Sequence, residues 1–504
     1  MKCKLIYFAK IIGITAITLL SSCTVQYDPI NIPVSVTYWK TEADANAAVF
    51  GNYYKLRETL GFGSNSGFLY FTYGDFATGI YQSTDWGDPH SFTGDFSYWG
   101  ASGYTQSDWS KFYKVILSAN LSIKNIANMP LTAFGGSDAK RKSYVGEALF
   151  VRAYTYFYMT RIWGTVPMLL DPVEDASEAV KDYPLSTEDQ LLSQCIVDLK
   201  KADSCLTWQA TAGKKAIRAN RASVNALLAH VYMWRTRANK TTIDKNDFEL
   251  ALKCIDNIEQ NSGASLETSD NMLSIWKGES IESLFEFPFK IADKEGFAIN
   301  AGFADRFMGY PYNTNRKDNG PIFKFAPEFL NLFSEPDKDL RVARLFENFY
   351  DQSNCFTTKY NTIQYTNTDK TAWETGGTVV IFRLADMYLL KAEALIKKAV
   401  PDVALARTYL DKIRVRAGLD PYQGGDATLY EAVSDERARE LFLEGQRLYD
   451  WVRTGFYAIK SPQGIYSPDR YLKEGYLFPV NYNLIVNNKY VHQTPYWQDK
   501  MNNN

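Results

Sequence analysis

Histidine is scarce in this sequence: only His90, His230 and His492 occur, far apart along the chain. The short motifs His-Glu-x-x-His, Gly-x-Ser-x-Gly and the P-loop are also missing. These absences argue against a zinc protease, a nucleophile-elbow hydrolase and a P-loop nucleotidase. A glycoside hydrolase needs no local motif, so it stays open as an alternative. His230 lies in an apolar stretch, and we expect it to be a hydrogen-bonded core residue.

The sequence also lacks a basic excess, with 55 Lys and Arg against 57 Asp and Glu, so no nucleic-acid partner is predicted. The few cysteines after Cys23 are spaced too widely for a metal motif, and buried free thiols are favoured. Asp85, Asp88 and Asp95 lie close together, but their spacing matches no EF-hand loop. No metal or other cofactor is therefore predicted. The thiols in question are Cys195, Cys205, Cys254 and Cys355.

A long apolar run occurs only at the N-terminus, from Ile11 to Leu20, after a lysine-rich start. It is too short to span a bilayer and is typical of a secretory signal. Leu20-Ser21-Ser22-Cys23 has the form of a lipobox, which predicts a signal peptide over 1–22 and acylation of Cys23. Residues 23–40 are expected to form a lipidated tether, and the rest of the chain to be soluble. An ordinary secreted protein is the alternative.

Residues 41–504 are predicted to form a single, mostly helical domain. Thr41 is a plausible N-cap for the first helix. The stretch from Asp138 to Ile162 is apolar all round, which predicts a helix in the centre of the core. Helix pairs of this size favour a tetratricopeptide-like solenoid with a few short strands. The predicted helices are Thr41–Leu60, Ser107–Asn128, Asp138–Ile162, Ser186–Leu206, Asn220–Thr236, Asp247–Asn261, Arg383–Lys398, Asp402–Ala417 and Thr428–Arg453.

Two long segments, about 61–106 and 277–373, interrupt the helical pattern. Both are rich in aromatic residues, and the second has a short helix predicted at Pro327–Phe333. Loops of this length inside a compact protein usually carry function, and their aromatic content argues against disorder. We call them the first and second excursions.

Several segments, in order along the chain, resemble the signatures of SusD/RagB-type lipoproteins. Thr494 stands where the closing motif of that family usually has Asn, which affects only the expected C-terminal packing. The segments are Glu147–Tyr154 with Arg161–Pro167, Arg383–Ala394, Ile413–Leu419, Glu436–Leu441 with Glu444–Asp450 and Arg453, and Phe478–Val480 with Gln493–Tyr496.

The resemblance implies an outer-membrane, lipid-anchored protein of Bacteroidetes type that faces the cell exterior. It also implies tetratricopeptide-like helix pairs, a SusC-like TonB-dependent transporter as partner, and capture of oligosaccharide or polysaccharide without catalysis. Some members of the family handle peptides instead, and a scaffold with no small ligand is a further alternative.

Glu440 and Glu444 could be mistaken for a catalytic carboxylate pair, but one helical turn rarely sets two acids across a substrate. The spacing favours structural ion pairs within a helix. The expected pairs are Asp435 with Arg439, Glu444 with Arg447, Asp450 with Arg453, and Arg383 with Glu393.

Sugar rings stack on flat aromatic side chains, while amides, acids and arginine bind the hydroxyls. The helices are occupied with core packing, so the aromatic residues of the two excursions are the candidates. The predicted ligand-binding residues are Tyr81, Gln82, Asp85, Trp86, Asp88 and Trp99 in the first excursion, and Arg306, Tyr310, Tyr312, Asn313 and Asn315 in the second.

Overall fold

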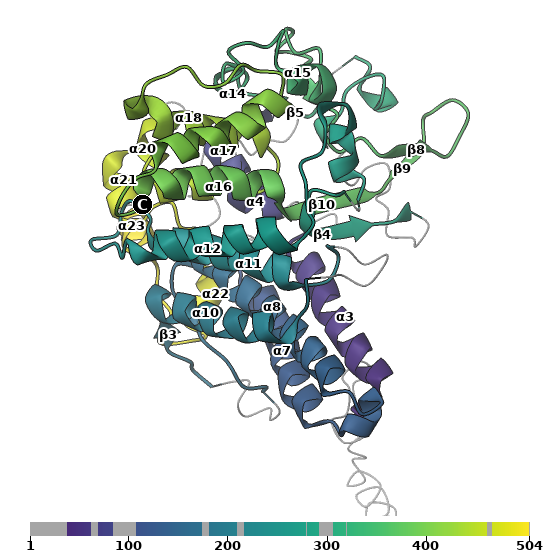
Figure 1. Ribbon diagram of the computed structural model, residues 1–504, viewed down its shortest axis with the longest axis vertical. Coiled ribbons are helices and arrows are strands. Elements are labelled where there is room, and N and C mark those ends of the chain that lie inside the picture. Colours follow the sequence, from purple (N-terminus) through teal and green to yellow (C-terminus); the bar gives the residue numbers. More distant parts are fainter. Residues whose placement is uncertain are drawn as a thin grey trace, which may run out of the picture.

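The computed structural model describes residues 38–61, 69–83, 107–173, 181–208, 216–278, 280–291, 306–318, 320–460 and 466–502. The predicted class is confirmed: the described chain is mostly helical, with short two-stranded sheets (Figure 1). Within these ranges no helix combines the length and apolarity needed to cross a bilayer.

The long helices form a stacked frame in which each packs mainly on its neighbours in the sequence, as Figure 1 shows. α7 packs on α8, α8 on α10, α10 on α11, α11 on α12, α12 on α16, and α16 on α17. This confirms the predicted solenoid of helix pairs. The frame helices are α3 (Glu42–Thr59), α7 (Ser110–Asn128), α8 (Asp138–Trp163), α10 (Glu188–Cys205), α11 (Arg221–Arg235), α12 (Asn246–Asn261), α16 (Leu384–Lys397), α17 (Val403–Arg416) and α18 (Asp426–Glu440).

Shorter helices and strands fill the excursions and the C-terminal part. The short helices are α4 (Leu69–Gly74), α14 (Pro327–Leu330), α15 (Leu340–Leu345), α19 (Arg447–Thr454), α20 (Tyr457–Lys460), α21 (Pro468–Leu472), α22 (Tyr482–Val486) and α23 (Pro495–Asn502), with 3-10 turns η1 (Phe76–Thr78), η3 (Leu131–Phe134), η4 (Ser269–Trp276) and η6 (Thr314–Arg316). The antiparallel strand pairs are β1 (Tyr81–Ser83) with β5 (Phe323–Phe325), β2 (Val166–Pro167) with β3 (Leu185–Ser186), β4 (Ser283–Phe289) with β10 (Gly377–Arg383), β6 (Phe346–Glu347) with β7 (Phe356–Thr357), and β8 (Ile363–Tyr365) with β9 (Trp373–Thr375).

Local capping explains where several helices begin. Thr41 caps α3, since its hydroxyl accepts the Asp44 N–H while the Asp44 carboxylate accepts the Thr41 N–H at 2.7 Å. Asn220 caps α11 through the N–H groups of Ala222 and Ser223. These contacts satisfy N–H groups that the helix itself leaves unpaired.

α8 lies at the centre of the core, as predicted. Every residue from Val145 to Trp163 is buried, so this part of the helix has no solvent face. Much of the aromatic content belongs to the same core: Tyr70, Tyr154 and Tyr158 stack with ring centroids 5.9 to 6.0 Å apart. The aromatic richness of the sequence is therefore partly a packing feature.

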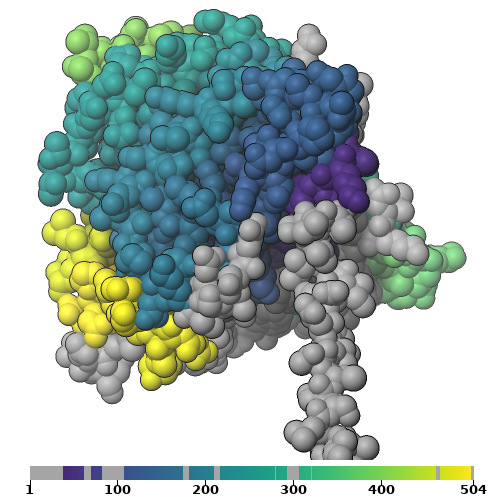
Figure 2. All heavy atoms as spheres, turned by 90° about the horizontal axis from the view of Figure 1, so that it is seen from below, coloured from purple at the N-terminus to yellow at the C-terminus, as the bar shows by residue number. Residues whose placement is uncertain are grey.

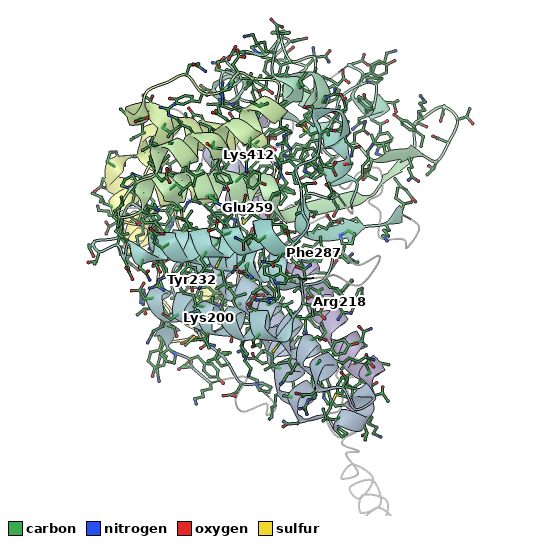
Figure 3. All side chains as sticks on the ribbon, in the orientation of Figure 1. Lys200, Arg218, Tyr232, Glu259, Phe287 and Lys412 are labelled. Carbon is green, nitrogen blue, oxygen red and sulfur yellow. The ribbon has the colours of Figure 1, made fainter. Side chains whose placement is uncertain are left out.

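Charged side chains on the outer face join successive helices of the frame. Glu259 of α12 pairs with Lys391 of α16 and lies 3.9 Å from Lys412 of α17 (Figure 3). Arg218 binds Glu147 of α8 at 2.6 Å. These contacts link neighbouring segments of the frame.

The prediction of one helix over Thr428–Arg453 is wrong, because α18 ends at Glu440 and α19 begins at Arg447. In the intervening loop Leu443 and Gly445 have left-handed φ angles of 56° and 68°. The loop carbonyls are bound from elsewhere: Leu443 O accepts the Tyr360 hydroxyl at 2.7 Å, and Glu444 O accepts the Tyr70 hydroxyl at 2.7 Å. Tertiary hydrogen bonds replace the helical ones.

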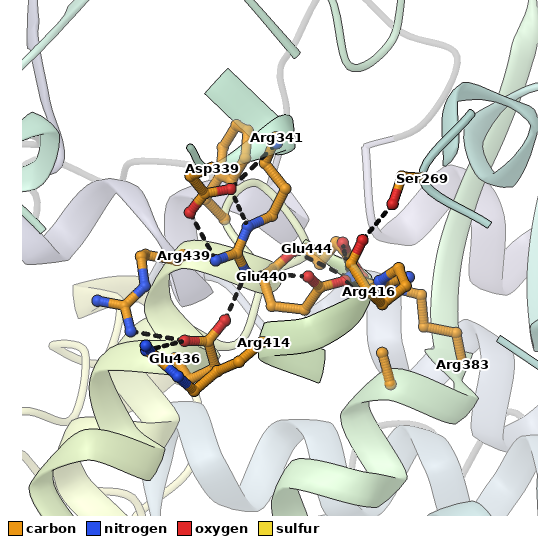
Figure 4. Close-up of polar contacts among 12 residues, drawn as sticks. Ser269, Asp339, Arg341, Arg383, Arg414, Arg416, Glu436, Arg439, Glu440 and Glu444 are labelled. Atoms are coloured by element: carbon orange, nitrogen blue, oxygen red, sulfur yellow. Dashed lines mark hydrogen bonds and ion pairs between the residues drawn. The ribbon is translucent and has the colours of Figure 1, made fainter. Parts of the chain in front are cut away.

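The loop between α18 and α19 also closes a buried ion network (Figure 4). Arg383 donates to Glu282 at 2.7 Å, to Glu440 at 2.6 Å and to both carboxylate oxygens of Glu444 at 2.8 and 2.9 Å. Arg341 donates to Glu440 at 3.1 Å. Most members of this group are almost inaccessible to solvent.

The network extends through further charged side chains at its edges. Lys359 donates to Glu444 at 2.6 Å, and Arg416 contacts Glu440 and Glu282. Burial raises the pKa of Glu440, but the guanidinium groups of Arg416, Arg383 and Arg341 outweigh burial and hold that pKa well below its usual range.

These charged residues form structural ion pairs, as predicted, but most of the predicted partners are wrong. Most of the actual partners lie on other elements, while Arg439 pairs with Glu436 one turn earlier in α18. Arg383 does not pair with Glu393, which binds Arg453 instead. Asp435 pairs with Lys460, Arg439 with Glu436, and Glu444 with Arg383 and Lys359. The Asp450–Arg453 pair is confirmed at 2.8 Å.

His230 is a satisfied core residue, as predicted, with Nε2 2.7 Å from Asp386 Oδ2. The four cysteines after Cys23 are free thiols, and Cys205 is the one among them that is partly exposed.

We expect Glu440→Gln to destabilise the protein by about 3–5 kcal/mol, since the amide leaves Arg341, Arg383 and Arg416 without their shared carboxylate. Urea unfolding at neutral pH measures this. The matched control on the same helix is Glu431→Gln, whose exposed pair with Lys460 should be worth less than about 1 kcal/mol. Equal losses in the two variants would show that the network does not support the fold.

Asp75 is fully buried and accepts the Gly445 N–H at 2.7 Å, and burial raises its pKa to about 7. The folded state therefore binds its proton more tightly than the unfolded chain, and this contribution to stability falls as the pH rises from about 4 to about 7. Asp75→Asn keeps an acceptor but carries no charge. Relative to wild type, its unfolding free energy should rise from pH 4.5 to pH 7.5; a constant difference would contradict this.

Candidate ligand-binding surface

The two excursions meet in one antiparallel strand pair. β1 and β5 align Tyr81 with Phe325, Gln82 with Lys324 and Ser83 with Phe323. The pairing joins residues 81–83 of the first excursion to residues 323–325 of the second. Predicted residues Asp85, Trp86, Asp88 and Trp99, like Asp95 and Cys23, lie outside the described residues.

Tyr81 does not meet the requirement for a stacking residue, because only 1% of its surface is exposed. Its ring packs against Phe76, Phe307 and Phe325 at centroid distances of 4.7 to 5.8 Å. Burial raises the pKa of its hydroxyl well above the usual value. Tyr81 is a core residue that holds β1 in place, so the prediction that it contacts a ligand is corrected. The backbone of Gln82 lies in β1, but its side chain is not among those that the structure describes.

The segment 306–318 carries the predicted residues of the second excursion. Tyr310 is half-exposed, at 50%, and Asn315 is exposed, so both are available to a ligand. Tyr312 and Arg306 are partly buried, and the Tyr312 hydroxyl donates to Glu347 at 3.1 Å.

Asn313 is fully buried, and its side-chain oxygen accepts the Asn315 N–H at 3.1 Å. This cap starts η6 and fixes the turn beneath Tyr310 and Tyr312. Asn313 is therefore a structural residue, and the prediction that it contacts ligand is corrected.

The hairpin β8–β9 supports the same segment. A small apolar cluster joins Met308, Phe356 and Trp373, and Tyr312, Ile363 and Tyr365 pack against it. The Tyr365 hydroxyl donates to the Tyr312 carbonyl at 2.9 Å. Because side chains alternate along a strand, Gln364 is turned away from this cluster.

A cleft of about 750 Å³ lies where β9 runs into β10. The strands approach so closely here that a Cβ on Gly376 would lie 2.6 Å from the Phe289 carbonyl oxygen. Beside the cleft, the Arg57 guanidinium lies 5.2 Å from the centre of the Phe289 ring. The lining residues are Ile217, Lys277, Gly278, Glu286, Pro288, Phe289, Lys290, Ile291, Asn361, Thr362, Ile363, Gln364, Gly376 and Gly377.

The polar side chains on the cleft wall suit reversible binding. Four polar side chains of the lining make no hydrogen bond or ion pair to any described residue: Lys277, Lys290, Asn361 and Gln364. Such convergent, unpaired donors fix the orientation of a polar ligand. Sequence reasoning missed these positions, although all lie within the predicted excursion.

Catalytic and metal chemistry find little support in the described residues. Glu286 is the one carboxylate on the described lining, and it accepts the Ser283 hydroxyl at 2.6 Å. Glycoside hydrolysis canonically uses two carboxyl groups across the scissile bond. The described ranges also contain no group of three or more His, Cys, Asp and Glu arranged to hold a metal ion.

Two family models match the chain over separate regions. One, described as the SusD family, matches residues 307–497, and the other, described as starch-binding associating with outer membrane, matches residues 76–233. A SusD-like protein of Formosa agariphila is 24% identical over 473 residues, which cover 85% of this chain and 86% of the relative.

Solved structures show the same architecture. A SusD homologue from Bacteroides thetaiotaomicron superposes with a TM-score of 0.79 and 25% identity, covering 91% of this chain and 99% of that one. A laminarin binding SusD-like protein superposes with a TM-score of 0.69 and 19% identity, covering 90% and 99%. With both family models, the relative and the superposed structures in agreement, the chain belongs to the SusD/RagB family.

Proposed function

We propose that this protein captures oligosaccharide or polysaccharide at the cell surface and delivers it to a SusC-like TonB-dependent transporter. SusD-like families are outer-membrane-associated binding proteins. The observation that carries the proposal is the open cleft beside hairpin β8–β9 in the second excursion, which is lined by polar side chains without a described partner.

The chemistry of this surface fits a saccharide. A sugar ring offers a face of C–H groups edged by hydroxyls, and a half-exposed ring such as Tyr310 can stack on that face. The amides of Asn361, Gln364 and Asn315 can bind hydroxyls in a shallow, hydrated site. The starch-binding family description and the laminarin binding structural relative support glycan over peptide as cargo.

Gln82, Asp85, Trp86, Asp88 and Trp99 remain part of the proposal. Their segment starts at β1, whose partner β5 leads into the same excursion as Tyr310. Arg306 and Tyr312 are proposed to support the site from partly buried positions.

We also propose that binding proceeds without turnover and that acylated Cys23 tethers the protein to the outer membrane, facing outward. A bound glycan would then stay intact until the transporter takes it. New reducing ends after incubation with the bound glycan would identify a hydrolase instead.

Tyr310→Ala should weaken the affinity for the bound glycan about fivefold to tenfold, because one stacking face is lost, which corresponds to roughly 1–1.4 kcal/mol. Calorimetry follows a screen that includes starch, laminarin and peptides. The control is Tyr350→Ala: this ring is 70% exposed, but its hydroxyl is bound to Asp337 and it lines neither the cleft nor the segment 306–318. Equal affinities of wild type and Tyr310→Ala would remove Tyr310 from the site, and binding of peptides alone would replace glycan as the cargo.

Cys23→Gly should abolish incorporation of labelled fatty acid and move the protein from the membrane fraction to the soluble fraction, since the acyl chains supply the anchor. Uptake of a fluorescent glycan by the cells should fall with it, while calorimetric affinity of the purified protein stays unchanged. Membrane retention of the variant would contradict the lipid anchor.

A further inference from the structure

A second cleft, of about 470 Å³, lies at the C-terminal part of the chain. Its volume falls within the range of about 300–1,000 Å³ that is usual for small-molecule sites. The lining residues are Trp109, Pro167, Lys181, Leu484, Asn487, Asn488 and Val491.

Hydrogen bonds between distant segments build this cleft. The Asn481 N–H, at the start of α22, donates to the Ser107 carbonyl at 3.0 Å, two residues before Trp109. Asn488 donates to the Tyr183 carbonyl at 3.0 Å and accepts the Tyr490 N–H at 3.0 Å. The walls are therefore fixed from both sides.

Three donors on these walls make no hydrogen bond or ion pair to a described residue, and one of them, the Lys181 ammonium, lies 5.7 Å from the centre of the Tyr183 ring. Trp109 is only 4% exposed, yet its indole N–H makes no hydrogen bond there. The Lys181 ammonium has no carboxylate partner, and the Asn487 carboxamide makes no hydrogen bond. A donor that lines a cleft and has no protein partner is free to bind a ligand acceptor.

No carboxylate occurs among the described lining residues. Asp182, next to Lys181, lies 3.6 Å from the Lys489 ammonium. The lining is thus rich in donors and carries one positive charge, while Pro167, Leu484 and Val491 supply apolar surface. A ligand that matches it carries oxygen acceptors, a negative charge and a C–H face.

We propose that this cleft binds an acidic sugar unit, a hexuronate, whose carboxylate pairs with Lys181 and whose oxygens accept from Trp109 and Asn487. Tyr490, which lies between two lining residues in the chain, is 44% exposed and offers a ring beside the site.

The site is separate from the surface around β8–β9. Figure 1 shows α22 and the hairpin well apart, and Figure 2 shows the C-terminal residues (yellow) and the hairpin (light green) on opposite sides. A uronate-containing polysaccharide could then be held at two points, which raises its overall affinity without new contacts at either one.

The test titrates a galacturonate disaccharide, with maltose as the neutral probe, into Tyr310→Ala protein, followed by saturation-transfer NMR and calorimetry. We expect the parent protein to bind the disaccharide in preference to maltose. The affinity for the disaccharide should be at least fivefold weaker in Lys181→Gln and in Trp109→Phe. The second variant keeps a buried ring but lacks the N–H. Added salt should weaken binding in the parent more than in Lys181→Gln.

Lys489→Gln is the matched control, because this nearby lysine is paired with Asp182 and does not line the cleft. It should bind like the parent. No uronate binding at millimolar concentration, equal binding of maltose, or equal losses in Lys489→Gln and Lys181→Gln would each overturn the proposal. If Trp109→Phe fails to fold, the exposed Lys181→Gln still decides the outcome.

Discussion

The buried pairing of Arg383 with Glu282, Glu440 and Glu444 holds the architecture together. Its partners come from the entry to β4, the end of α18 and the loop before α19, so one guanidinium fixes three segments. Burying charges is costly unless each is paired, and here the geometry supplies the pairs. The helices of the frame can then carry two long excursions whose own strands are short.

Features set by local chemistry could be predicted from the sequence. Thr41 and Asn220 begin their helices as expected, since a cap needs only nearby residues. The ion-pair partners could not, because Arg383 lies 57 to 101 positions from its carboxylates. The break after Glu440 was missed for the same reason: its loop is held by Tyr70 and Tyr360, which lie far away in the chain.

The sequence indicated the segments that carry the candidate site, but only some of its individual residues. Composition located both excursions, and Tyr310 is exposed as expected. It could not tell a ring on the surface from the buried ring of Tyr81, since both sit in aromatic-rich stretches. Hairpin β8–β9 was missed because its turn uses a non-glycine residue, Lys370, at a φ of 59°, so no glycine marks it.

The bonds that join Asp75 and Tyr70 to the loop at Glu444 and Gly445 span 370 and 374 positions. Contacts of such high sequence separation form late, because a long loop must close first. The base of the first excursion therefore gains its final support only once most of the chain has emerged. An intermediate that lacks these two hydrogen bonds would hold the apolar residues of α4 less firmly, and exposed apolar surface in intermediates favours aggregation.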